Sequence, residues 1–188
     1  MASQVTLRPY AAADEDAAIE LWRRTWQQHY PHLNFSERVS WWRERWRKEL
    51  VPVARIVLAE VDRAPPQPPF IPAKAGIQSQ DSGVAERGPG SPLSRGRTDK
   101  ALAGFVTIDP QTMYLDQIVV APEHWGSNVA LTLLDEAKRI SPRGLDLLVN
   151  KDNFRAIRFY QKHGFTYAGE DKNPVSGIAV NRMTWRPA

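Results

Sequence analysis

The chain of 188 residues contains no cysteine. This absence excludes disulfide bonds, thiolate metal ligands and a cysteine nucleophile. The sequence also has no apolar run near the ~20 residues that a membrane-spanning helix needs. Its first ten residues, MASQVTLRPY, include no apolar signal segment. Together these absences favour a cytoplasmic location.

The composition is that of a folded domain with an ordinary core, because 42% of the residues are hydrophobic and 24% are charged. The net charge is +4 and the isoelectric point is about 9.5. The basic residues do not form one run; they are spread over segments 43–48, 87–100 and 155–162. The charge alone therefore gives little support to a nucleic-acid partner, and none is expected.

Hydrophobic periodicity and turn residues predict a single α/β domain, a mixed sheet with helices on both faces. Helices are expected at 14–30, 35–50, 127–140 and 153–164. Strands are expected at 5–10, 54–62, 101–109, 113–122 and 144–150, followed by two strands in the tail over 165–171 and 177–185.

Residues 64–99 interrupt this pattern, because they are rich in Pro, Gly and Ser and show almost no apolar periodicity. We interpret them as a disordered insertion in a hairpin. Lengthening a loop from about 5 to about 40 residues costs only ~2 kcal/mol of closure entropy. Residues 71–77, IPAKAGI, can be back-translated into an inverted repeat that resembles palindromic repeats of bacterial genomes, which suggests how the insertion arose.

A turn of small residues, Gly126–Asn128, separates the strand YLDQIVV from an apolar helix in the segment HWGSNVALTLL. The backbone N–H groups of 126–130 would then converge at a helix N-terminus. Such an arrangement binds phosphate without needing side chains. The alternative is a simple helix cap formed by Ser127 or Asn128.

A second motif follows in NFRAIRFYQKHGF, with Asn153 at a helix start and Ala156, Phe159 and Tyr160 at i+3, i+6 and i+7. Together the two motifs resemble the GNAT superfamily of acetyl-CoA-dependent N-acetyltransferases. The resemblance covers 5–62 and 101–185 in element order and is strongest over 114–165.

The resemblance implies the GNAT fold, acetyl-CoA as co-substrate and an amine acceptor, and it allows a homodimer. The pantetheine arm would lie between strands 116–120 and 147–150. The implied coenzyme-binding residues lie in that first strand, in the turn and in the second motif. They are Ile118, Val119, Val120, Trp125, Gly126, Ser127, Asn128, Val129, Ala130, Asn153, Ala156 and Tyr160.

The turn departs from the family pattern Q/R-x-x-G-x-G/A at two positions, Trp125 and Asn128, whereas Ala130 fits. Asparagine tolerates a positive φ, so Asn128 should cost ~1 kcal/mol or less. A missing arginine–phosphate contact is worth ~1.5–3 kcal/mol. Arg155 or Arg158 could supply that contact, or Trp125 could stack on the coenzyme.

For the chemistry, the resemblance makes Tyr160 the general acid that protonates the leaving thiolate. YLDQIVV is also similar to the YLED strand of spermidine/spermine acetyltransferases, which assigns Asp116 as the base. The alternatives are a core aromatic at Tyr160 and a structural carboxylate at Asp116. Gln117 should point to the opposite face from Asp116 and could meet substrate instead.

The resemblance implies an acceptor pocket lined by the first two helices, the central strands and the final hairpin. The candidates are Trp26, His29, Tyr30, Trp42, Trp46, Gln117 and the loop 173–177. Tryptophans at i, i+4 spacing could instead simply pack on the sheet, and we favour this packing role for Trp22 and Trp46. His29 and His32 are too few for a zinc site, so no metal is expected.

The sequence therefore predicts acetyl transfer to a primary amine of a small molecule or peptide by direct attack in a ternary complex. The alternative is a non-catalytic acyl-CoA-binding protein of the same fold.

Overall fold

The computed structural model describes residues 4–62, 100–173 and 177–187. The predicted insertion at 64–99 and residues 174–176 of the predicted acceptor loop lie outside the described residues. No helix within the described ranges combines the length and the apolar character that crossing a membrane requires.

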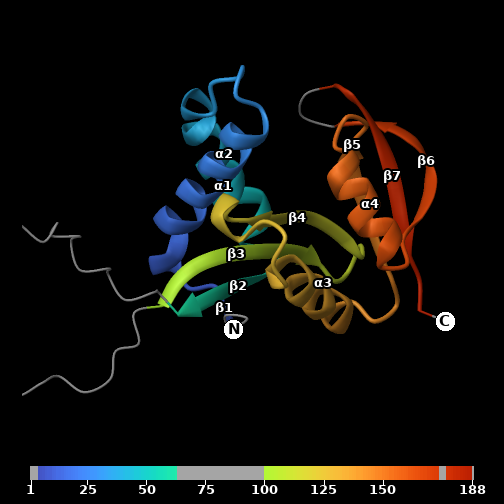
Figure 1. Cartoon of the computed structure of the whole chain (residues 1–188), viewed down its shortest axis with the longest axis horizontal. Helices are drawn as coiled ribbons and strands as arrows, with labels where there is room; N and C mark the ends of the chain where they lie inside the picture. The colour runs from blue at the N-terminus through green and yellow to red at the C-terminus, as the bar shows by residue number, and fades with distance from the viewer. Residues whose placement is uncertain (1–3, 63–99, 174–176, 188) are drawn as a thin grey trace, which may run out of the picture.

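Seven strands form one sheet in the order β1-β2-β3-β4-β5-β7-β6 (Figure 1). Neighbouring strands are antiparallel except for β4 and β5, which are parallel. The strands are β1 (Val5–Pro9), β2 (Arg55–Asp62), β3 (Lys100–Asp109), β4 (Tyr114–Val120), β5 (Leu145–Asn150), β6 (Thr166–Lys172) and β7 (Ala179–Trp185).

The helices cover both faces of this sheet, as the sequence predicts. α1 and α2 pack on one face and α3 and α4 on the other, and each pair has its own hydrophobic cluster. The helices are α1 (Glu15–His29), α2 (Val39–Arg45), α3 (Val129–Ile140) and α4 (Phe154–Lys162). A π-helical segment, Trp46–Leu50, continues α2, and single 3₁₀ turns lie at Ala12–Asp14, Ser36–Arg38 and Pro122–His124.

The face covered by α1 and α2 is held together by aromatic rings. Trp22 stacks on Trp42 with ring centroids 4.7 Å apart, and Trp46 meets Phe105 edge-on at 5.3 Å. The packing alternative for Trp22 and Trp46 is therefore the correct one. Helical spacing places these rings on one side of each helix, where they exclude water from the sheet.

Two irregularities in β4 shape the middle of the sheet. The β3–β4 register passes from Thr107–Gln117 to Ile108–Leu115, so Asp116 is the extra residue of a β-bulge. Between β4 and β5 the ladder consists of one pair, Tyr114–Asp146. Beyond this pair the two parallel strands diverge towards their C-terminal ends and leave a gap between them.

α3 approaches β3 closely because Gly104 has no side chain. A Cβ at this position would lie 2.7 Å from the carbonyl oxygen of Val119 and 3.0 Å from Leu133 Cδ1. The carbonyl belongs to the backbone of β4, so it cannot move without disturbing the sheet.

We expect Gly104→Ala to lower the free energy of unfolding by about 1–3 kcal/mol, because the added methyl overpacks this contact. Urea unfolding measures the change. Ala101→Val, which adds bulk at a half-buried position of the same strand, should have little effect. An unchanged midpoint for Gly104→Ala would contradict the close approach.

Candidate functional site

A cleft of about 550 Å³ opens where β4 and β5 diverge. It lies between α1, the end of β4, the turn before α3, and α4. Nineteen residues line it: Thr25, Trp26, His29, Ile118, Val119, Val120, Trp125, Gly126, Ser127, Asn128, Ala130, Leu131, Asn153, Arg155, Ala156, Phe159, Tyr160, Lys162 and His163. Every coenzyme-binding residue expected from the sequence lines this cleft except Val129, which is buried against Gly104.

The turn before α3 presents backbone donors to the cleft. The N–H groups of Gly126, Asn128, Ala130 and Leu131 have no hydrogen-bond partner in the described part of the chain. Ser127 Oγ accepts a 3.3 Å hydrogen bond from the Val129 N–H and so caps the helix. Free N–H groups at a helix N-terminus are a binding site for an anion.

The expectation that Asn128 needs a positive φ is wrong. Its φ is −80°, an ordinary helical value, and the positive φ of the turn, 87°, falls on Gly126. Asn128 therefore carries no backbone strain, and its departure from the family pattern leaves the shape of the turn intact.

Trp125 is fixed by two contacts. Its indole Nε1 donates a 2.8 Å hydrogen bond to the carbonyl oxygen of Val120, and the guanidinium of Arg155 lies 4.8 Å from the centre of its ring. The first contact ties the turn to the end of β4. The second brings a cation from α4 to the turn.

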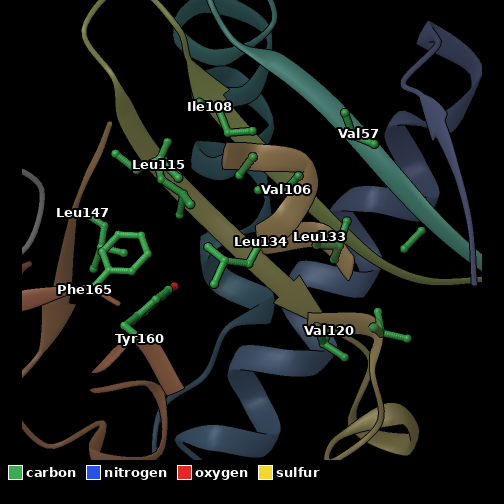
Figure 2. Packing of buried hydrophobic residues seen from close by; sticks show 14 of the residues in the cluster. Val57, Val106, Ile108, Leu115, Val120, Leu133, Leu134, Leu147, Tyr160 and Phe165 are labelled. Carbon is green, nitrogen blue, oxygen red and sulfur yellow. The ribbon is translucent and has the colours of Figure 1, made fainter. Parts of the chain in front are cut away.

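α4 begins as predicted, because the side chain of Asn153 accepts a 3.1 Å hydrogen bond from the Ala156 N–H. Gly164 ends the helix with a φ of 88°. Tyr160 packs beside Phe165 in the core (Figure 2). It also lines the cleft. Its hydroxyl has no hydrogen-bond partner among the described residues, and burial raises the pKa of Tyr160 above the ordinary value for tyrosine.

Asp116 does not line the cleft. Both of its carboxylate oxygens accept hydrogen bonds from Arg45 of α2, at 3.0 and 2.5 Å, and its side chain is 10% exposed. The guanidinium of Arg45 also lies over the ring of Trp42. This arrangement matches the structural alternative for Asp116, in which the carboxylate anchors the bulge of β4 to α2.

The prediction that Gln117 and Asp116 point to opposite faces is wrong. Gln117 Nε2 donates a 3.0 Å hydrogen bond to Asp116 Oδ1. The bulge at Asp116 interrupts the alternation of the strand, so both side chains lie on the same side. Gln117 is absent from the cleft lining.

The other acceptor candidates divide into three groups. Trp26 and His29 line the cleft from α1. Tyr30 bridges the gap instead, because its hydroxyl accepts from Asn150 Nδ2 at 2.9 Å and donates to Asp152 Oδ1 at 3.0 Å. Trp42 is 1% exposed and belongs to the core, which corrects its placement in the acceptor pocket.

Several lining residues were not expected from the sequence, among them Thr25, Leu131, Phe159, Lys162 and His163. Thr25 and His29 lie one helical turn apart, and Thr25 Oγ1 donates a 3.3 Å hydrogen bond to Val120. Thr25 could have been predicted from His29, because residues four apart in a helix lie on the same face. The described residues contain no cluster of three or more side chains suited to a metal ion.

A comparison of the sequence with known protein families points to the same family as the two motifs that line the cleft. The model of the acetyltransferase (GNAT) family matches residues 15–165, most of the chain. The chain belongs to the GNAT acetyltransferase family. Its members use acetyl-CoA, and the chain is accordingly a GNAT-type acetyltransferase. Comparison with curated protein sequences finds no match.

Solved structures show the same fold. A GCN5-related N-acetyltransferase from Rhodopseudomonas palustris aligns with a TM-score of 0.62 at 16% identity, covering 100% of this chain and 98% of that one. The PaiA N-acetyltransferase from Thermoplasma acidophilum, in complex with coenzyme A, gives 0.62 at 17%, covering 98% and 99%. The spermidine/spermine N-acetyltransferase SpeG from Vibrio cholerae gives 0.53 at 20%, covering 97% and 92%.

We expect Asn128→Gly to change the affinity for acetyl-CoA by less than about threefold, equivalent to under ~0.7 kcal/mol. The reason is that Asn128 already has a helical φ, so glycine relieves no strain. Calorimetric titration measures the affinity. A tenfold gain with glycine would show that the turn is damaged by the asparagine.

We expect Arg45→Leu to lower the free energy of unfolding by roughly 3 kcal/mol, because it leaves the Asp116 carboxylate buried without its cation. Replacing both residues by leucine should recover most of the loss. Arg47→Leu is the matched control, since Arg47 pairs with Glu15 on the surface, and it should change little. Equal losses for Arg45→Leu and Arg47→Leu would contradict this account.

Proposed function

We propose that this chain transfers the acetyl group of acetyl-CoA to a primary amine. One observation carries the proposal: a helix N-terminus with unpartnered N–H groups opens onto a cleft that Tyr160 also lines. The first feature suits the phosphates of the coenzyme and the second suits its sulfur.

The residues of the cleft fit the donor along its length. The pyrophosphate would meet the N–H groups of Gly126, Asn128 and Ala130. The pantetheine arm would continue along Ile118–Val120, where β4 has no strand partner on the side of β5. Backbone amides of an unpaired strand edge are free to bond to the amides of the arm.

The reaction in this proposal is direct. The amine nitrogen attacks the thioester carbonyl carbon, a C–N bond forms, and the C–S bond breaks. The thiolate takes a proton from the Tyr160 hydroxyl, and the phenolate recovers a proton from solvent. A backbone N–H of Ile118–Val120 would polarise the carbonyl oxygen during attack.

The proposal does not use Asp116 as the base. Its carboxylate is held by Arg45 and lies outside the cleft lining, so it would reach an amine only after that ion pair had opened. The amine enters as the free base in this scheme. After attack the nitrogen loses one of its two protons to solvent and keeps the other as the amide N–H. Asp116 holds the bulge of β4 in place.

The acceptor would approach Trp26 and His29, the two acceptor candidates that line the cleft. The ring of Trp26 stacks parallel to Tyr30 at 5.9 Å, and that of His29 meets Tyr30 edge-on at 4.5 Å. An aromatic wall of this kind suits the hydrocarbon part of an amine.

Thioester cleavage measured over a panel of primary amines tests the proposal. The native chain should bind acetyl-CoA in the micromolar range and release free thiol with at least one amine. Binding without cleavage over the whole panel would favour the non-catalytic alternative. No binding would contradict the proposed function altogether.

We expect Tyr160→Phe to lower kcat by about 10²–10⁴, the usual contribution of a positioned general acid. The affinity for acetyl-CoA should stay within a few fold, because the ring and its packing remain. Phe159→Leu, which alters the neighbouring lining residue but keeps the hydroxyl, is the matched control and should retain activity. Equal kcat for Tyr160→Phe and the native chain would remove Tyr160 from the mechanism.

The pH dependence follows from the same residue. Burial raises the pKa of Tyr160, so the phenol remains protonated at pH values where an exposed tyrosine would begin to ionise. We therefore expect no loss of kcat up to pH 10 through ionisation of Tyr160. A fall in kcat between pH 8 and 9 that disappears in Tyr160→Phe would contradict this expectation.

A further inference from the structure

The turn before α3 has backbone donors but no cationic side chain of its own. The segment 125–131 contains Trp125 where the family pattern has glutamine or arginine. Backbone N–H groups carry partial charges, whereas a phosphate group carries full negative charge. A cation near the turn would therefore strengthen the binding of a phosphate considerably.

Arg155 comes from another element, one helical position beyond the first residue of α4, and reaches this turn. Its guanidinium lies 4.8 Å from the centre of the Trp125 ring, and both side chains line the cleft. Arg155 forms no ion pair with any carboxylate in the ranges that the structure describes. Its charge is thus not neutralised by the protein.

Trp125 can hold the guanidinium in place because the indole itself is fixed. The hydrogen bond from Nε1 to the Val120 carbonyl oxygen sets the plane of the ring. A guanidinium on an aromatic face keeps the N–H groups at its edge available, since the ring contacts its flat side. Those N–H groups form the fork that suits two phosphate oxygens.

We propose that Arg155, seated on the ring of Trp125, is the cation that binds the phosphates of the acyl donor in this chain. This inference rests on the proposed function and specifies how its donor is recognised. The charge that the family pattern places at position 125 is supplied here from α4, and Trp125 is the positioning residue for it.

Two other cations of α4 serve as comparisons. Arg158 lies on the same helix and is exposed, as Arg155 is, but it does not line the cleft. Lys162 lines the cleft two turns further along the helix, and no contact joins it to the turn among the described residues. From the sequence, Arg155 and Arg158 were equal candidates for the missing phosphate contact. In the structure only Arg155 of these two lines the cleft.

Calorimetric titration with acetyl-CoA tests the assignment in the full chain. We expect Arg155→Ala to weaken binding by about 10- to 100-fold, the loss of one charge-assisted contact. Arg158→Ala removes the same charge from the same helix and should weaken binding by less than about threefold. Equal effects of the two substitutions would overturn the assignment, because general attraction would then explain both.

S-acetylpantetheine separates a phosphate contact from any other effect of the substitution, because it carries the thioester but no phosphate. We expect Arg155→Ala to leave kcat/KM for this donor unchanged while lowering kcat/KM for acetyl-CoA. A similar loss with both donors would overturn the inference and show that Arg155 shapes the cleft instead.

The double variant Arg155→Ala, Trp125→Arg returns a cation to the turn itself. If the charge has been relocated, this variant should bind acetyl-CoA at least about tenfold more tightly than Arg155→Ala alone. Thermal unfolding confirms that it is folded. No gain in the folded double variant would overturn the inference.

Binding without thioester cleavage would count against the proposed transfer but not against the contact of Arg155 with the phosphates. Absence of a donor site altogether gives a different pattern. The native chain would then bind neither acetyl-CoA nor S-acetylpantetheine, and no substitution would matter. Micromolar binding and thioester cleavage by the native chain, with no loss of affinity in Arg155→Ala, would instead leave the proposed function in place and overturn the assignment of Arg155.

Discussion

β4 and β5 pair in parallel at Tyr114 and Asp146 and then diverge. This single pair joins the two parts of the seven-stranded sheet, β1-β2-β3-β4 and β5-β7-β6, and a gap separates them beyond it. A continuous ladder would satisfy the backbone edges of both strands and leave no room for a ligand. Because the ladder stops, the end of β4 keeps free edge groups and a cleft opens beside it. Tyr30 spans the gap from α1 to Asn150 and Asp152 at the end of β5.

The rigidity of this arrangement comes from the face packed by α1 and α2. Stacked tryptophans bury that face, and Arg45 ties α2 to the bulge of β4 through Asp116. On the other face, Gly104 lets α3 come close enough for its N-terminus to lie at the end of β4. The groups proposed to bind the donor are therefore backbone atoms of well-packed elements, and the side chains that would complete the site need only be few.

Much of the fold could be predicted from the sequence, because each helix and strand has a clear period and clear end signals such as Asn153 and Gly164. The lining of the cleft by the turn and by the start of α4 was also predictable, because both motifs can be read from the sequence. The role of Asp116 was not, because a bulge of one residue changes which face a side chain meets and leaves no local signal. Trp42 was misplaced for a related reason: helical spacing gives the apolar side of α2 but not which rings the sheet covers. The contact of Arg155 with Trp125 joins two motifs 30 residues apart. The sequence could therefore name Arg155 and Arg158 as candidates for this contact but could not choose between them.

The most direct measurement of the central claim is the change in backbone amide NMR shifts when coenzyme A and then phosphate-free pantetheine are added to the full chain. The account predicts that coenzyme A shifts the amides of Gly126, Asn128, Ala130 and Leu131 together with those of 118–120. Pantetheine should shift the strand amides but leave the turn unchanged. Large shifts confined to β1, β2 or the β6–β7 hairpin, with an unperturbed turn, would contradict the claim that this gap and its helix N-terminus form the donor site.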